Sequence, residues 1–178
     1  KKADFLVSVL PYANKHFESI ANCKLKFKHI PNGILTNSNS NIRLDSKIDN
    51  LIPKDKFIIG YAGSLGVANS MEFFVDAARL TENSNYYFVV VGDGSLKKEL
   101  EDQAIGLSNI IFIPSISKYQ IPSLLSKFDI LYLGWRNKSI YNFGISANKI
   151  FDYMYSGKPI LMSGNVPGNE IIASRCGV

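Results

Sequence analysis

Short apolar runs alternate with helical patterns along most of this 178-residue chain. Runs that are apolar almost throughout and stop at proline, glycine or polar residues are typical of buried strands. Such runs occupy residues 3–10, 57–62, 86–91, 110–113, 129–133 and 159–162. Residues 24–30 differ because apolar and basic residues alternate there, before a turn at Pro31-Asn-Gly33. The pattern predicts strands at these positions.

Helical patterns fill the segments between the apolar runs. The clearest follows residue 70, where apolar residues recur at the spacing of one helical face: Met71, Phe74, Val75 and Ala78. Asn69 or Ser70 is expected to cap this helix, and Ser95 to cap a polar helix that ends near Ala104. Further helices are predicted over residues 12–21, 43–51, 117–127, 146–155 and 169–174, and the Asn- and Ser-rich residues 36–42 form a loop.

Strands and helices that alternate in this way predict an α/β fold. Strands that are apolar on both faces belong to a parallel sheet with helices covering each side, so a Rossmann-like domain is expected. Ligands of such folds bind beyond the carboxyl ends of the strands. Several glycine-containing loops directly follow predicted strands, which places them at that edge of the sheet.

Composition narrows the classes of function. The net charge of +5 is spread along the chain, with no basic stripe of the kind that nucleic acid requires. Anionic small ligands or an anionic membrane surface fit this charge better. Cys23 and Cys176 are far apart, and the sequence has neither a Cys/His cluster nor an Asp-x-Asp motif, so no metal site is expected. The chain begins and ends in mid-pattern, which indicates a fragment of a longer protein.

The loops after the strands carry the candidate anion site. Gly63-Ser64-Leu-Gly66 precedes a helix, so its amides and those of the helix start can face a phosphate, with Ser64 and Asn69 as further partners. The alternative is a tight turn that needs glycine for its backbone alone. Gly92, Pro114, Ile116 and Arg136 follow other strands and are candidates to line the same pocket. The alternatives are an ordinary turn at Gly92, a routine connection at Pro114 and Ile116, and a solvated loop side chain at Arg136. Asp93 is interpreted as a turn residue.

The segment Phe143–Ile160 is the most informative one. It predicts a glycine-marked loop, a short helix, a glycine stop and a strand. Lys149 and Asp152 are three residues apart and share a helix face near its start, which offers a cation for phosphate and a carboxylate for sugar hydroxyls. Ser146 and Asn148 at the same helix start are further candidate substrate contacts. The alternative is a surface Lys–Asp pair on an ordinary helix.

These motifs in their order resemble a known family. Pro31–Ile34, Gly60–Gly66 with Asn69, Val91–Ser95 and Asn148–Ile160 are similar to the C-terminal half of family 4, two-Rossmann (GT-B) glycosyltransferases. The likeness covers essentially the whole chain. It is nearest to bacterial enzymes that build capsule, O-antigen or exopolysaccharide units.

The resemblance implies a domain division and a function. Residues 1–30 would be the tail of an N-terminal acceptor domain, and residues 31–178 an incomplete C-terminal domain that binds a nucleotide-diphosphate sugar. Transfer would retain the anomeric configuration, need no metal or cofactor, and use a glycan or lipid-linked acceptor. A cytoplasmic location with contact at the inner membrane is implied as well. Asp152 would hold the donor ribose and Lys149 would face the diphosphate.

The chain also departs from the family pattern. Many relatives carry an Arg and a Lys that clamp the pyrophosphate, and those positions are Ser64 and Asn69 here. The family pairs two carboxylates eight residues apart, but the earlier position is Gly144 here. These losses favour a nucleotide-binding module without catalysis as an alternative. A nucleotide-sugar epimerase of the same fold is a second enzymatic alternative, which would need additional acid/base residues, and the two histidines are poorly placed for that role. An NAD-binding domain is less favoured because the loop lacks the GxGxxG spacing.

Overall fold

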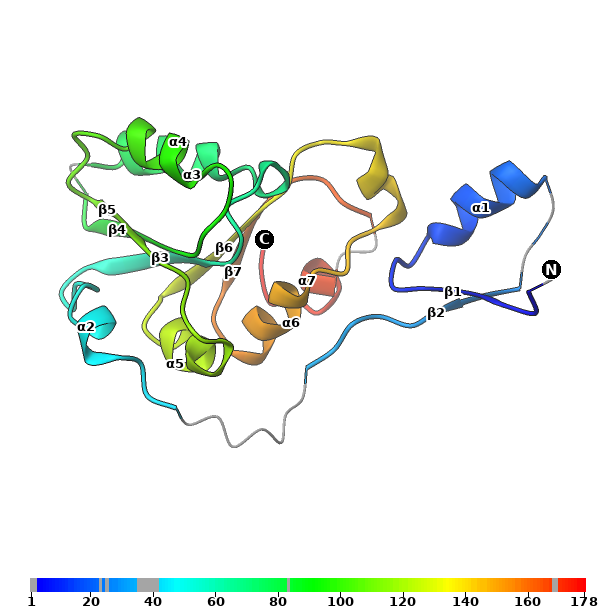
Figure 1. Cartoon of the computed structure of the whole chain (residues 1–178), viewed down its shortest axis with the longest axis horizontal. Coiled ribbons are helices and arrows are strands. Elements are labelled where there is room, and N and C mark those ends of the chain that lie inside the picture. The colour runs from blue at the N-terminus through cyan, green and yellow to red at the C-terminus, as the bar shows by residue number, and fades with distance from the viewer. Residues whose placement is uncertain (1–2, 23, 25, 35–41, 83, 168–169) are drawn as a thin grey trace.

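The computed structural model describes residues 3–22, 24, 26–34, 42–82, 84–167 and 170–178. The strands fall into two separate parallel sheets. A small sheet pairs β1 (Leu6–Ser8) with β2 (Phe27–His29), and helix α1 (Ala13–Ala21) connects them. A larger five-stranded sheet forms the main body (Figure 1).

The main sheet is parallel throughout and has the order β5-β4-β3-β6-β7. Its strands are β3 (Phe57–Ala62), β4 (Tyr86–Val91), β5 (Ile110–Ile113), β6 (Ile130–Gly134) and β7 (Ile160–Ser163). Chain order reverses between β3 and β6, so the carboxyl end of β3 lies at the switch point where parallel sheets bind ligands. The prediction of an α/β fold with a parallel sheet is confirmed.

Helices cover both faces of this sheet, as predicted (Figure 1). One face carries α3 (Met71–Leu80) and α4 (Lys97–Gln103), and the other carries α5 (Ile121–Leu125) and α6 (Asn148–Tyr155). Short helices complete the described chain: α2 (Ser46–Asp49), α7 (Glu170–Ala173), and 3-10 turns η1 (Val67–Asn69), η2 (Lys118–Gln120) and η3 (Ser139–Phe143).

Alternating side chains of the strands divide the interior into two cores. On β4, Phe88 and Val90 pack with α3 and α4, whereas Val89 and Val91 pack with α5 and α6. All four side chains are buried. Because both faces of the sheet exclude water, its strands are apolar at nearly every position. Such continuous apolar runs made the strands easy to predict from the sequence.

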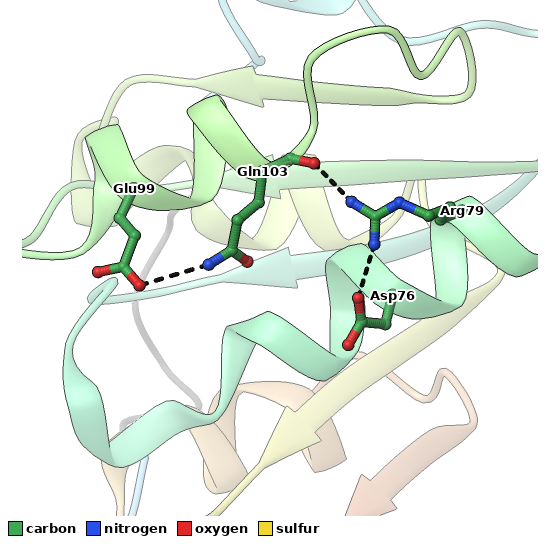
Figure 2. Close-up of polar contacts among 4 residues, drawn as sticks. All are labelled: Asp76, Arg79, Glu99 and Gln103. Atoms are coloured by element: carbon green, nitrogen blue, oxygen red, sulfur yellow. Dashed lines mark hydrogen bonds and ion pairs between the residues drawn. The ribbon is translucent and has the colours of Figure 1, made fainter.

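Polar contacts join the exposed sides of α3 and α4 (Figure 2). The Arg79 guanidinium donates to the Asp76 carboxylate at 2.7 Å and to the carbonyl of Gln103 at 2.6 Å. The Gln103 amide in turn donates to Glu99 at 3.3 Å. These exposed bonds contribute little stability individually, so the buried side chains beneath them hold the layer together.

The N-terminal unit, which consists of β1, α1 and β2, packs against the main body at η3. The Tyr12 amide donates to the Phe143 carbonyl at 3.1 Å, and the rings of His16 and Phe143 lie 5.3 Å apart. The Asn32 side chain donates to the Ser146 carbonyl at 2.6 Å. The predicted turn at residues 31–33 therefore touches the segment that leads into α6.

Two predicted helix caps are wrong. The α3 helix begins after Ser70, but the Ser70 hydroxyl makes no capping bond, and Asn69 instead turns its amide toward the loop before it. The α4 helix begins after Leu96 rather than Ser95. The strand predicted over residues 3–10 is also shorter, because β1 has only the three-residue β2 to pair with. The loop predicted over residues 36–42 falls almost entirely outside the described residues.

Candidate functional site

A shallow hollow of about 320 Å³ lies at the carboxyl edge of the main sheet. It is lined by the loops that follow β3, β4 and β5, by the end of β4 and by the start of α5: Gly63, Ser64, Val91, Gly92, Asp93, Ser115, Ile116 and Ile121. The structure therefore brings Gly63, Ser64, Gly92 and Ile116 together, as the sequence predicted. Pro114 is exposed and does not line the hollow, whose wall is formed by Ser115 instead.

Glycine is required where the first two loops meet. A Cβ at Gly92 would collide with the carbonyl oxygen of Gly63, and one at Gly94 would lie 2.5 Å from the carbonyl oxygen of Leu65. The loops are joined by a bond from the Leu65 amide to the Asp93 carbonyl at 2.9 Å. Where these two loops meet, backbone atoms are therefore packed directly against backbone atoms, with no room for side chains between them.

Asp93 has a larger role than the predicted turn residue. One carboxylate oxygen accepts from Lys97 at 2.7 Å, and the other accepts from the Ser115 amide at 2.8 Å. The hydrogen bonds from Lys97 and then from Ser115 lower the pKa of the Asp93 carboxyl below its ordinary value. Asp93 thus joins the loop after β4 to the loop after β5 and fixes the width of the hollow.

Lys149 reaches from α6 to the loop after β3. Its ammonium donates to the Tyr61 hydroxyl at 2.8 Å and to the Asn69 side-chain oxygen at 2.6 Å, and lies 4.7 Å from the centre of the Tyr61 ring. A Cβ at Gly63 would lie 3.3 Å from the same ammonium, so glycine gives the lysine its path. The predicted partners Gly63, Asn69 and Lys149 are therefore neighbours.

Burial shifts the pKa values of both Lys149 and Tyr61. Desolvation lowers the pKa of Lys149 to about 8, because the charged form loses water without gaining a carboxylate. Desolvation also raises the pKa of Tyr61, with smaller contributions from Tyr153 and Tyr132. Tyr61 therefore keeps its proton and donates it to the carbonyl of Ser64 at 2.6 Å.

A second tyrosine attaches α6 to the central strand. The Tyr153 hydroxyl accepts from the Ala62 amide at 2.8 Å and lies 3.2 Å from the Ala62 carbonyl, to which it donates. Its side chain is buried, and desolvation raises its pKa. Because β6 pairs with β3 only at Ile59 and Gly60, the Ala62 amide needs a partner outside that ladder, and Tyr153 supplies it. This bond holds α6 at the height where Lys149 meets the loop.

Asp152, one turn after Lys149 on α6, has different surroundings. It lines a cavity of about 140 Å³ between α5 and α6, with neighbours that include Ile34, Ile121, Tyr155 and Ser156. Burial raises the pKa of its carboxyl, and Lys118 opposes the shift. Lys149 and Asp152 form no ion pair with each other, so the alternative of a surface pair is wrong. Ile121 lines both this cavity and the hollow beside Gly63.

The remaining predicted site residues lie farther from this cluster or have other partners. Arg136 pairs with Glu72 at the start of α3, at 2.9 Å. The Ser146 hydroxyl accepts a hydrogen bond from the backbone amide of Asn32 at 3.2 Å. Asn148 is exposed at the first position of α6, and Gly66 precedes η1, where a Cβ would lie 3.7 Å from the Ser64 hydroxyl. Arg136 therefore pairs with Glu72 rather than joining the hydrogen bonds around the Lys149 ammonium.

Gly144 adopts a backbone that other residues avoid, with φ 96° and ψ −178°. A Cβ there would lie 2.5 Å from the ring carbons of Pro11. The position at which the resemblance leads one to expect a carboxylate is therefore closed by backbone conformation and by the N-terminal unit. A side chain cannot be restored there without local rearrangement.

Comparison with known proteins identifies the family. Residues 56–178, well over half of the chain, match the family described as glycosyl transferases group 1. The chain belongs to this family. The resemblance noted in the sequence is thereby confirmed, and the matched range contains the Gly63 loop, Lys149 and Asp152.

The chain is also similar to individual proteins. It is 35% identical over 80 residues, 44% of this chain and 20% of the relative, to WcaI of Escherichia coli K12, named as a colanic acid biosynthesis glycosyl transferase. Its fold matches WaaG, a glycosyltransferase of lipopolysaccharide biosynthesis, with 19% identity and a TM-score of 0.72, over 97% of this chain and 48% of WaaG. Anabaena HepE, solved with UDP and glucose, matches at 18% identity and a TM-score of 0.70, over 95% of this chain and 47% of HepE.

The chain thus spans about half the length of these two solved structures. Their likeness shows that the main body has the fold of the C-terminal half of a GT-B protein. Within the described ranges, no helix has the length and apolar character needed to span a bilayer. Among the same described residues, no three His, Cys, Asp or Glu side chains gather where they could hold a metal ion.

Sequence reasoning missed Tyr61, Asp93, Ser115 and Tyr153 as members of this site. Tyr61 lies inside an apolar strand, and its side chain has 0% exposure, so the pattern predicts a core residue. A signal was available in the sequence: a hydroxyl two residues before a glycine loop, at the carboxyl end of a buried strand. Tyr153 offered no comparable signal because its partner, Ala62, is 91 positions away.

Proposed function

We propose that this chain is the donor-binding half of a retaining glycosyltransferase that uses a uridine diphosphate sugar. The family match supports glycosyl transfer, and HepE was solved with UDP and glucose. A second similar structure, the pneumococcal O-GlcNAc transferase GtfA, was solved with UDP and GlcNAc. The proposed product is a surface polysaccharide, in keeping with the names of WaaG and WcaI.

The observation that carries the proposal is the buried ammonium of Lys149 at the switch point of the sheet. Its partners, Tyr61 and Asn69, are neutral. Within the described residues no carboxylate lies at ion-pair distance from it. A buried cation without a counter-ion is costly unless a ligand provides the negative charge. A diphosphate bound over Gly63 would provide it.

The proposed catalysis is positioning and electrostatics. As the bond from the sugar to the diphosphate breaks, negative charge grows on the leaving phosphate, and Lys149 would stabilise it. The amides of Ser64 and Gly66 would help, since neither has a partner among the described residues. Asp152 would bind the ribose hydroxyls and so orient the anomeric carbon. No metal takes part in this scheme.

We also propose the division into domains. Residues 1–30 would belong to the acceptor domain and residues 31–178 to the donor domain, with the turn at residues 31–33 between them. The separate β1–β2 sheet supports this division, as do apolar side chains left exposed in its unit, such as Phe5 at 61% and Ile20 at 70%. The acceptor would be a glycan or lipid-linked sugar at the cytoplasmic face of the inner membrane.

Calorimetric titration tests the proposal. The chain is titrated with UDP, GDP and ADP in EDTA and then with Mg²⁺, and the full-length protein is assayed for release of UDP from UDP-glucose and UDP-GlcNAc. UDP is expected to bind most tightly, with affinities in the two buffers within about twofold, and UDP release is expected to require an acceptor. Preference for another nucleotide, or an absolute need for Mg²⁺, would contradict the proposal.

One observation favours a second candidate, a nucleotide-binding module without catalysis. Gly144 cannot carry the carboxylate that relatives use for the donor sugar, because Pro11 fills its place. Such a module would bind UDP and UDP-glucose with equal affinity and release no UDP in the presence of any acceptor. The turnover assay on the full-length protein separates the two functions, because both of them predict binding of UDP.

A further inference from the structure

Four residues form a closed ring of hydrogen bonds at the carboxyl end of β3. Lys149 donates to Tyr61 and to Asn69, as described above. Tyr61 and Asn69 then both donate to one acceptor, the carbonyl of Ser64, at 2.6 Å and 2.8 Å. Each of the two neutral side chains therefore joins the ammonium to the same backbone oxygen of the glycine loop.

The ring leaves one donor of the lysine for a ligand. An ammonium has three N–H groups and no acceptor. Two of them are engaged within the described residues, by Tyr61 and Asn69. Because these two bonds fix the nitrogen in two directions, the direction of the third N–H is fixed too. No third partner of the ammonium lies among the described residues, and a Cβ at Gly63 would lie 3.3 Å from the nitrogen, so only glycine leaves room beside it.

The identity of residue 69 matters to the ring. Asn69 uses both ends of its amide, because its oxygen accepts from Lys149 while its nitrogen donates to Ser64. A lysine at this position could not accept, and it would bring a second ammonium beside the first. The departures from the family pattern at Ser64 and Asn69 are therefore compatible with a single, fixed lysine rather than with a pair of mobile cations.

Building on the proposed function, we infer that Tyr61 and Asn69 are positioning residues, which link the Lys149 ammonium to the Ser64 carbonyl and so direct its third N–H to the diphosphate of the donor. Tyr61 also places its ring 4.7 Å from the ammonium, which favours the charged form. Neither residue touches the ligand in this arrangement. Each acts through Lys149.

The alternative is that Tyr61 and Asn69 serve only to stabilise the fold. Tyr61→Phe separates the two roles, because it keeps the buried ring and removes only the hydroxyl. Tyr87→Phe, on the neighbouring strand β4 and far from the loop, is the matched control. Asn69→Ala tests the same ring from a partly exposed position, so it remains informative if Tyr61→Phe does not fold.

The experiment measures binding of UDP and uridine to the chain by calorimetry at pH 7. Tyr61→Phe and Asn69→Ala are each expected to weaken UDP binding by about tenfold and uridine binding by less than about twofold. Tyr87→Phe should bind both like the unmodified chain. In the background of Lys149→Met, Tyr61→Phe and Asn69→Ala should have no further effect on UDP, since they act through that lysine.

Three outcomes would overturn the inference. Equal losses for UDP and uridine would indicate a structural role, and so would losses that persist in the Lys149→Met background. Unchanged UDP affinity in both variants would show that Lys149 needs no positioning, while the proposed function stands. If the unmodified chain binds none of UDP, GDP and ADP, the proposed function and this inference fail together.

Discussion

The Lys149 ammonium lies 2.8 Å from the Tyr61 hydroxyl, although 88 positions separate the two residues in the sequence. The contact joins helix α6 to the carboxyl end of the central strand β3. The contact places one cation beside the loop at residues 63–66, which contains no charged residue. The role of that cation can be tested by substitution.

Lys149→Met should selectively weaken binding of nucleoside diphosphates. Methionine keeps the length and apolar stem of the side chain and removes the charge, so packing between α6 and β3 is retained. We expect UDP affinity to fall by about tenfold to a hundredfold, as loss of a charge-assisted hydrogen bond implies, while uridine affinity stays within about twofold. Calorimetry with the two ligands measures the difference. Equal loss for both would exclude a phosphate contact.

Asp152→Asn should weaken ribose recognition with little effect on stability. Its carboxylate lines the cavity beside Ile121, and an amide of the same shape keeps the packing but loses the negative charge that binds two hydroxyls well. UDP affinity is expected to fall by about tenfold.

The matched ligand for Asp152→Asn is 2′-deoxy-UDP, which lacks one of the hydroxyls. Its affinity should differ less between the variant and the unmodified chain than the affinity of UDP does. A fall in melting temperature with unchanged UDP binding would instead assign Asp152 a structural role. Thermal unfolding of both chains, followed by circular dichroism, gives that comparison.

UDP affinity should depend on pH through Lys149. Burial lowers the pKa of this lysine to about 8 in the free chain. Below that pH the ammonium is charged and attracts the diphosphate; above it, binding must take up a proton, so affinity falls. The phosphate, whose second pKa is about 6, is already ionised there.

Titrations of UDP from pH 7 to 9.5 in buffers of different ionisation enthalpy measure this effect. The dissociation constant should be flat up to pH about 8 and then rise, with proton uptake in the same range. Tyr61 contacts the lysine but remains protonated, because burial raises its pKa. Lys149→Met should show a flat profile over this range, and a rise that persists in that variant would assign the titration to another group.

Sequence patterns predicted the sheet better than the site. The strands at Phe57–Ala62 and Tyr86–Val91 have the predicted bounds because apolar runs between turns leave few alternatives. The start of α3 was harder, since Ser70 has cap chemistry but adopts a left-handed φ of 47° and makes no capping bond. A cap depends on local geometry that residue type does not fix.

The members of the candidate site were predicted where a local motif held them. Lys149 and Asp152 were found through one eight-residue helix, but the expectation of a shared face did not reveal that Lys149 bonds to Tyr61 while Asp152 lines the cavity between α5 and α6. The ring around Ser64 depends on how α6 sits on β3, and the Tyr153 hydroxyl bound to Ala62 sets that placement. Such long-range contacts leave no spacing in the sequence.

Gly144→Ala should destabilise the fold at the junction with the N-terminal unit. The φ of 96° with extended ψ is a conformation open almost only to glycine, so a methyl group there is expected to lower the free energy of unfolding by about 1–3 kcal/mol. Contact with Pro11 at 2.5 Å adds to the effect. Gly33→Ala is the matched control, because open space surrounds Gly33, and its effect should be small. Urea unfolding of the three chains measures the difference.

In a Gly144→Ala chain that also carries Pro11→Ala, the loss of stability should be smaller, since the ring carbons are gone while the backbone strain remains. If Gly144→Ala unfolds at the same urea concentration as the unmodified chain, the position is free to accept a side chain, and its lack of a carboxylate has no structural cause.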